Sequence, residues 1–253
     1  MRATWVIPCY NEAARLASDE LVALIDEAGE IDLLLVDDGS TDRTAEKLRD
    51  LAARRPDRVR LLLLEKNGGK AEAVRQGLLE ALRGGAEIVG YLDADLATPL
   101  SEMRRLTEIA IRQQIDVVLG SRVLMMGRHI ERRHLRHYLG RVFATGASLA
   151  LKLSVYDTQC GAKVFRQTAA LQWALREPFL SRWAFDVELI GRLLTAPDAV
   201  DSSRVIEEPL YQWRDVPGSK LRFGQMAGAV ADLGRVAWRL REQRARSRVP
   251  PRR

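Results

Sequence analysis

Two aspartates separated by a single residue are the clearest chemical signal in the sequence. Asp93 and Asp95 follow residues 87–90, an apolar run typical of a buried strand. Residues i and i+2 of an extended chain point the same way, so both carboxylates can face one point. Two like charges held so close need a cation between them, and oxygen ligands without nearby His or Cys indicate Mg²⁺ or Mn²⁺. The pair predicts a metal site for a nucleotide diphosphate, and a solvated turn is the alternative.

The segments that position this pair alternate between strands and helices. Right-handed crossovers between such elements produce an α/β fold with an open, doubly wound, mostly parallel sheet. Ligands of these sheets bind beyond the carboxyl ends of the strands, and here a polar cluster follows each of five strands. We therefore expect one shared site. Strands are expected at 3–7, 31–36, 59–64, 87–90 and 115–119, and helices at about 19–28, at about 43–54, between 70 and 85, and from about 99.

The second half of the chain is less regular. Helices are expected at about 135–153, from 182 and at about 223–241, and a short strand at 205–211. Residues 155–165 hold a polar turn between apolar flanks, and 213–220 are expected to form a loop. The Arg- and Pro-rich tail after 241 is expected to be disordered.

Composition limits the class of protein and its surroundings. With 253 residues, 47% hydrophobic and 29% charged, the chain suits one large soluble domain or a domain with an appendage. The net charge of +6 is concentrated in 122–141 and 239–253, which indicates phosphates, anionic lipid or nucleic acid as neighbours. Cys9 and Cys160 are the only cysteines, so a reducing, cytoplasmic compartment is expected. No apolar run reaches the length of about 18 residues that a membrane span needs, so any membrane contact should be peripheral.

Six short motifs occur in order along the chain. They are VIPCYNE at 6–12, VDDGSTD at 36–42, NGGK at 67–70, LDAD at 92–95, DTQCG at 157–161 and RWAFDVE at 182–188. The first four resemble the inverting family 2 glycosyltransferases of GT-A fold. The last two are more specific and resemble the polyprenyl-phosphate (dolichyl-phosphate) transferases, especially their glucosyl branch. The resemblance spans about residues 3 to 220.

The resemblance implies a role for each matching residue. Residues expected at the nucleotide are Pro8, Tyr10, Asn11, Glu12, Asp37, Asp38, Lys70, Asp93 and Ala94. Residues expected to act on the sugar, leaving group or acceptor phosphate are Asp95, Arg122, Gln159, Arg214 and Lys220. Asp93 and Asp95 would hold the Mg²⁺ or Mn²⁺. Mannosyl relatives often carry Gln where this chain has Ala97, which favours glucose and leaves a third protein ligand unassigned.

The resemblance also implies a domain organisation and partners. Residues 1–220 would form the GT-A catalytic domain, with a nucleotide-sugar half at about 1–122 and an acceptor half at about 123–220. Residues 221–253 would form an amphipathic helix and a basic tail. The partners would be a nucleotide-sugar donor, a lipid-phosphate acceptor and the cytoplasmic face of a membrane, but no nucleic acid. The basic residues expected to attach the protein to that surface are Arg128, Arg132, Arg133, Arg136 and Arg141.

The implied reaction is metal-dependent transfer of a hexose to a polyprenyl or dolichyl phosphate, most simply glucose from UDP-glucose with inversion. A phosphate monoester, with a second pKa of about 6, needs no dedicated base. Asp186 is expected to orient a neighbouring Arg or to complement a helix N-terminus, with a catalytic base as the less favoured alternative. Alternatives are transfer of mannose from GDP-mannose, a family 2 transferase with another acceptor, or a non-catalytic, basic nucleotide- or nucleic-acid-binding module. The last does not explain the paired acids, which repel a polyanion in the absence of metal. No Gly-x-Gly-x-x-Gly follows the first strand, which disfavours a nicotinamide-binding domain.

Overall fold

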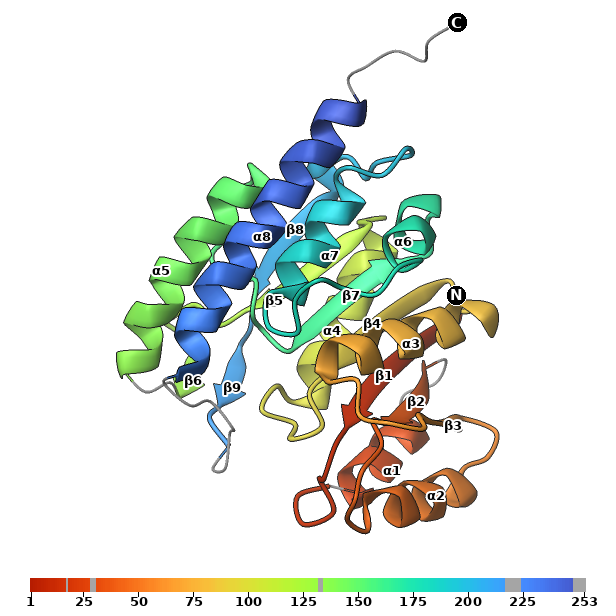
Figure 1. The fold of residues 1–253 in the computed structure, drawn as a ribbon. Coiled ribbons are helices and arrows are strands. Elements are labelled where there is room, and N and C mark those ends of the chain that lie inside the picture. Colours follow the sequence, from red (N-terminus) through yellow and green to blue (C-terminus); the bar gives the residue numbers. More distant parts are fainter. Residues whose placement is uncertain (17, 28–30, 132–133, 217–223, 248–253) are drawn as a thin grey trace, which may run out of the picture.

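A seven-stranded sheet forms the centre of the computed structural model, which describes residues 1–16, 18–27, 31–131, 134–216 and 224–247 (Figure 1). The strands lie in the order β3-β2-β1-β4-β7-β5-β8. Their bounds are β1 Ala3–Cys9, β2 Ile31–Asp37, β3 Val59–Leu63, β4 Ile88–Leu92, β5 Val117–Ser121, β7 Ala162–Arg166 and β8 Val205–Pro209. The α/β fold with a mostly parallel sheet is therefore confirmed.

The first half of the chain follows the predicted alternation of strands and helices. All seven residues of β2 are buried, as a continuous apolar run requires when helices cover both faces of a parallel sheet. The helices here are α1 Ser18–Glu27, α2 Thr44–Arg54, α3 Lys70–Arg83 and α4 Leu100–Arg112. The predicted bounds are close to these, because the apolar periodicity of each segment is unbroken.

Two hydrophobic cores cover the two faces of the sheet. Successive residues of a strand point to opposite faces, and in β1 Val6 belongs to one core while Trp5 and Ile7 belong to the other. Helix α3 packs on the side of Val6, together with helices from the second half of the chain, and α1, α2 and α4 contribute to the side of Trp5. Helices therefore pack on both faces of the sheet and fix the positions of the carboxyl ends of its strands.

Strand β7 was not predicted. Its five residues include Lys163 and follow a polar turn, so no clear strand pattern marks them. In the part of the chain that the structure describes, β7 alone runs against the other strands of this sheet, because it pairs antiparallel with both β4 and β5. Strands β4 and β5 are thereby separated, and the loop before β7 comes to the rim where the other strands end.

The second half of the chain builds a helical layer. Helices α5 His134–Leu151, α6 Ala169–Ala174, α7 Phe185–Leu193 and α8 Gly224–Ser247 contribute to it, with α5 and α8 side by side (Figure 1). Helix α8 runs beyond the predicted end at Arg241, and the last six residues of the predicted tail lie outside the described residues. No helix among the described residues is long and apolar enough to cross a membrane.

A second, two-stranded sheet pairs segments that are far apart in the sequence. Strand β6 His129–Glu131 and strand β9 Gln212–Arg214 run parallel. The expected loop at 213–220 is therefore wrong at its start, where Trp213 and Arg214 extend beside Ile130 and Glu131. The main sheet takes strands from both predicted halves of the catalytic domain, and that division stays a prediction.

Candidate active site

The loops at the carboxyl ends of the parallel strands meet at one rim of the sheet. The loop after β2 bonds to the loop after β1, where Asp38 N donates to Cys9 O at 2.9 Å. The loop after β3 bonds in turn to the loop after β2 through Gly68 N and Asp38 Oδ1, 2.8 Å apart. Since β7 is reversed, the loop that precedes it, with Gly161, lies against Asp93.

Lys70 and Asp93 form an ion pair at this rim. Lys70 Nζ lies 2.5 Å from Asp93 Oδ1, and the two side chains are 39% and 36% exposed. The other oxygen, Oδ2, faces Gly161 so closely that a Cβ there would lie 2.1 Å away. Burial lowers the pKa of Lys70, but the carboxylates of Asp93 and Asp186 outweigh it and leave that pKa above its usual value. Without any ligand, the carboxylate of Asp93 is thus already paired with the ammonium group of Lys70.

Asp95 keeps one oxygen available for a ligand. Its Oδ1 accepts a hydrogen bond from Ala97 N at 3.1 Å, and Oδ2 has no hydrogen bond among the described residues. Burial, followed by the nearby charge of Asp93, raises the pKa of Asp95. A divalent cation beside both carboxylates would reverse this effect, because opposite charge favours the ionised form.

The two aspartates are the carboxylates that this site offers to a metal. No three His, Cys, Asp or Glu side chains gather as a metal-binding group in the part of the chain that the structure describes. Mg²⁺ is commonly held by one or two carboxylates, with substrate phosphates and water completing its shell. Asp93 and Asp95 therefore fit Mg²⁺ or Mn²⁺ in the presence of a diphosphate.

Strand β9 brings Arg214 to the same loop. Arg214 N donates to Ala97 O at 3.1 Å, two residues beyond Asp95. The Arg214 side chain is exposed, and no partner for it occurs among the described residues. It is therefore available to an anion near the aspartates. Lys220, which the sequence pairs with Arg214, lies outside the described residues.

Asp37 and Asp38 differ in what they bind. Asp38 accepts hydrogen bonds from Gly68 N and Gly69 N, each at 2.8 Å, and so fixes the start of α3. Asp37 accepts one from Ser40 N at 3.2 Å through Oδ2, while its Oδ1 is buried without a partner. An unpaired buried acceptor is costly, so Asp37 Oδ1 can accept a hydrogen bond from a ligand.

The loop after β1 is built around Asn11. Its Oδ1 accepts a hydrogen bond from Thr41 N at 2.9 Å, and its φ of 52° lies in the left-handed region that asparagine tolerates. Glu12 forms a two-bonded ion pair with Arg15. Pro8 and Tyr10 are half-buried beside them, and Ala94 is buried between the two metal-site aspartates.

Arg122 is already paired. Its Nε and Nη2 lie 2.6 and 2.8 Å from the two carboxylate oxygens of Asp157. Burial lowers the pKa of Arg122, but Asp157 outweighs it and raises that pKa further above its usual range. The nearby Gln159 Nε2 is buried without a partner, as are Ser121 Oγ and Thr158 Oγ1. These atoms therefore have hydrogen-bonding capacity that the described residues do not use.

A buried network beneath the rim was missed by sequence reasoning. Lys163, which is 0% exposed, lies 2.7 Å from Asp186 Oδ1 and donates to Cys160 O at 2.5 Å. The Tyr91 hydroxyl also donates to Asp186 Oδ1. Burial, followed by the charge of Asp186, raises the pKa of Tyr91 well above its usual value. Asp186 is therefore engaged as a counterion and is poorly placed to act as a base. The sequence feature that could have indicated this network is a lysine between apolar residues at 162–165.

Arg182 is a second rim cation to which the sequence assigned no role of its own. Its Cδ would lie 3.5 Å from a Cβ added at Gly69, next to the start of α3. Burial raises the pKa of Asp38, and Arg182 is among the groups that partly offset this. Within the described residues the exposed Arg182 side chain has no hydrogen-bond or ion-pair partner. It can therefore meet an anion near Lys70.

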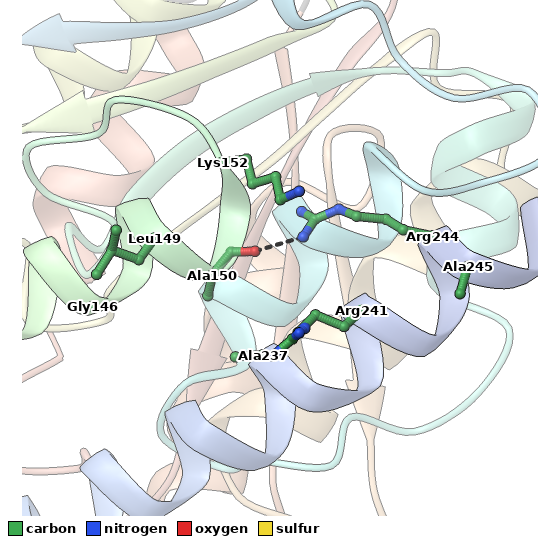
Figure 2. A pocket seen from close by; sticks show the side chains of 8 residues that line it. All are labelled: Gly146, Leu149, Ala150, Lys152, Ala237, Arg241, Arg244 and Ala245. Atoms are coloured by element: carbon green, nitrogen blue, oxygen red, sulfur yellow. Dashed lines mark hydrogen bonds between the residues drawn. The ribbon is translucent and has the colours of Figure 1, made fainter. Parts of the chain in front are cut away.

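A groove of about 530 Å³ lies between α5 and α8, and none of its lining residues belongs to the rim (Figure 2). Its walls combine small apolar residues with three basic ones. They are Gly146, Leu149, Ala150, Lys152, Ala237, Arg241, Arg244 and Ala245. Arg244 donates to Ala150 O and Leu151 O, both at 2.9 Å, and so joins α8 to the end of α5.

Comparisons with known proteins identify relatives of the chain. A profile described as Glycosyl transferase family 2 matches residues 4–172. The chain is 32% identical to a dolichyl-phosphate beta-glucosyltransferase of Trichomonas vaginalis, over 92% of this chain and 70% of the relative. It is 31% identical to a dolichyl-phosphate beta-glucosyltransferase of Dictyostelium discoideum, over 92% of this chain and 73% of the relative.

A solved structure shares the fold. Glucosyl-3-phosphoglycerate synthase from Mycobacterium tuberculosis, in complex with Mn²⁺, UDP and glucosyl-3-phosphoglycerate, superimposes with a TM-score of 0.67. The identity is 20%, and the match covers 94% of this chain and 80% of that chain. At this identity the likeness concerns the fold alone.

Proposed function

Because the chain belongs to glycosyl transferase family 2, we propose that it transfers glucose from UDP-glucose to the phosphate of a polyprenyl or dolichyl lipid. The names of its relatives in Trichomonas vaginalis and Dictyostelium discoideum support the sugar and the lipid. The observation that carries the proposal is the group of Asp93, Asp95 and Lys70 at the rim. Membership in the family favours a transferase over a non-catalytic binding module.

A bound metal ion would be held by Asp93 and Asp95, together with the diphosphate of the donor. When bound, Mg²⁺ or Mn²⁺ stabilises negative charge on the departing diphosphate. Cationic side chains of the protein also stabilise the negative charge of the departing diphosphate. They are effective because they are already in place and need no rearrangement during the reaction. Lys70 stands beside Asp93 and is proposed to contact the phosphates.

The nucleotide is proposed to occupy the loops after β1 and β2. The buried, unpaired Asp37 Oδ1 suits an N–H donor of the base, and uracil carries one. Pro8 and Tyr10 are proposed to line the base and ribose, while Asn11 and Glu12 hold the loop through Thr41 and Arg15. Asp38 serves the same site indirectly, since its bonds to Gly68 and Gly69 set the position of Lys70.

The proposed chemistry is a single displacement. A phosphate oxygen of the acceptor forms a bond to C1 of glucose while the bond from C1 to the diphosphate oxygen breaks, and the electron pair leaves with UDP. Attack from the opposite face gives a β-linked product from the α-linked donor. The acceptor phosphate is close to dianionic at neutral pH, with a second pKa of about 6, so it needs no proton acceptor. The burial of Asp186 with Lys163 and Tyr91 supports a reaction without a dedicated base.

The acceptor phosphate needs cations that hold no other partner. Arg214 and Arg182 satisfy this condition at the rim within the described residues, and Lys220 is proposed to join them. Arg122, whose guanidinium is held by Asp157, is proposed to shape the sugar pocket together with Gln159. Arginine suits phosphate because its planar fork can donate two hydrogen bonds at once.

The membrane surface is proposed to contact the outer side of α5 and α8. Val142 and Leu149 on α5 are 71% and 76% exposed, and Trp238 on α8 is 65% exposed. Exposed cations flank them, and the groove between the helices adds Lys152 and Arg241 (Figure 2). Apolar side chains entering the interface beside cations that attract anionic headgroups produce peripheral binding. Of the five arginines first assigned to this contact, Arg132, Arg133 and Arg136 have side chains outside the described residues.

Charge placed on this surface should release the protein from vesicles. Leu149→Glu and Trp238→Glu are each expected to lower the fraction bound to phosphatidylcholine vesicles with phosphatidylserine by about tenfold, because each removes roughly one buried apolar side chain from the interface. The fraction of protein bound to the vesicles is measured by flotation. Leu63→Glu, at an exposed position of β3 on the far edge of the sheet, is the matched control and should bind like the unmodified protein. Equal binding by all variants would place the membrane contact elsewhere.

The transfer itself is tested with purified protein, Mn²⁺ and a short polyprenyl phosphate. Each radiolabelled nucleotide sugar is supplied in turn, and labelled lipid is extracted. Label from UDP-glucose alone is the expected result. Label from GDP-mannose instead would assign the protein to the mannosyl alternative, and hydrolysis of the donor without labelled lipid would overturn the proposed acceptor.

A further inference from the structure

In the protein without ligands, Asp93 is paired with a cation through one oxygen and packs against the backbone through the other. Oδ2 packs against the backbone of Gly161, where even a methyl group would collide with it. Oδ1 is bound by Lys70 Nζ at 2.5 Å. A metal that uses Oδ1 must therefore take it from Lys70 or share it, and a metal on Oδ2 would bind the same carboxylate that the ammonium group already holds.

Sharing is unfavourable because both partners are cations. Like charges held within a few ångströms repel strongly near a protein surface, and the repulsion is twice as large when one of them is divalent. No third acid joins Asp93 and Asp95 as a metal-binding group among the described residues, and the nearby Asp186 is already paired with Lys163. The ammonium group thus neutralises one of the two carboxylates that the metal needs.

Once a nucleotide is present, its diphosphate offers the ammonium group of Lys70 a second anionic partner. It is the first residue of α3, and its long side chain is 39% exposed rather than locked in the core. The aromatic rings of Tyr91 and Phe185 lie 5.9 Å from Nζ and bound one side of it. A diphosphate at the rim would accept the ammonium group and leave Asp93 Oδ1 to the metal.

We propose that Lys70 is a built-in counterion that keeps divalent metal off the free protein, so that metal and nucleotide bind together. The inference rests on the proposed function, because it takes Asp93 and Asp95 as the metal ligands and a nucleoside diphosphate as the ligand. By linkage, the nucleotide then tightens metal binding by the same factor as the metal tightens nucleotide binding. Lys70 acts here as a positioning residue, distinct from its contact with the phosphates.

The test measures Mn²⁺ binding rather than catalysis. Free Mn²⁺ is followed by electron paramagnetic resonance during titration of the full chain, with and without UDP. For the unmodified protein, UDP is expected to tighten Mn²⁺ binding by about tenfold or more, within the usual range of coupling. In Lys70→Met, which removes the charge at an exposed helix position, Mn²⁺ should bind the free protein about tenfold more tightly, and the effect of UDP should shrink. Lys66→Met, an exposed lysine of the preceding loop, is the control.

The possible failures are distinguishable. If Lys70→Met and Lys70→Gln bind Mn²⁺ without UDP as weakly as the unmodified protein, while UDP still tightens binding, the counterion role is overturned and the metal site stands. If no variant binds Mn²⁺ even with UDP, or if Asp93→Asn binds it normally, the metal site of the proposed function fails and the inference fails with it.

Discussion

Replacing Asp95 with asparagine is expected to lower the rate of sugar transfer by about 10²- to 10³-fold, since a metal ion supplies several kcal/mol of charge stabilisation. Asparagine keeps an oxygen that can accept the hydrogen bond from Ala97 N, so the loop retains its shape and only the charge is lost. The loss should appear in kcat at saturating donor and Mn²⁺. It is measured as labelled lipid formed per unit time.

The control for this variant is Glu65→Gln. Glu65 is an exposed acid in the loop after β3, and its charge faces solvent. It should retain transfer within about twofold of the unmodified protein, since exposed charges contribute little. A rate for Asp95→Asn close to that of Glu65→Gln would show that the Asp-x-Asp pair is a structural turn and would leave the proposed reaction without its metal site.

The replacement Lys163→Met should cost about 3–5 kcal/mol of unfolding free energy, because it leaves the carboxylate of Asp186 buried without its cation. The side chains of Lys163 and Asp186 are 0% and 6% exposed, so water cannot replace the lost partner. Urea unfolding followed by circular dichroism measures the change. Arg83→Met, an exposed position on α3, should stay within about 0.5 kcal/mol and serves as the control.

The double replacement Lys163→Met with Asp186→Asn tests whether these two residues contribute to stability as a coupled pair or independently of each other. Removing both charges should cost less than the sum of the single changes by about 1–3 kcal/mol, as expected for residues in contact. Additive costs would contradict a coupled pair. The kcat of Asp186→Asn adds a second readout, since a general base would show a loss of about 10²-fold or more with a changed pH profile.

The local pattern of the sequence was sufficient for the first half of the molecule. The runs at 3–7 and 31–36 are continuous and apolar, and each ends in a polar cluster, so their strands and the shared rim follow from composition and connection rules. Asp93 was identified because its position beside Asp95 carries chemical meaning without any partner. Its pairing with Lys70, 23 residues earlier, depends on where the start of α3 lies relative to the end of β4.

The parts that could not be predicted depend on contacts between distant segments. Asp157 reaches Arg122 across 35 residues, and Lys163 reaches Asp186 only after β7 has inserted between β4 and β5. The direction of β7 follows from the loops that flank it rather than from its own five residues. The pairing of β6 with β9 joins segments of three residues each, which is too short for a local pattern to be reliable.

The position of the antiparallel strand β7 in the sequence also determines when the central sheet can be completed during synthesis of the chain. When β5 emerges from the ribosome, β4 and β5 each still lack the neighbour that lies between them, since β7 begins 41 residues after Ser121. Until then their bare edges are templates for pairing with other chains. The nascent chain therefore completes its central sheet late, and helix α5 is synthesised during this interval. A polypeptide that stopped at Ser121 would hold most of the nucleotide loops and yet expose unpaired strands, which favours aggregation over folding.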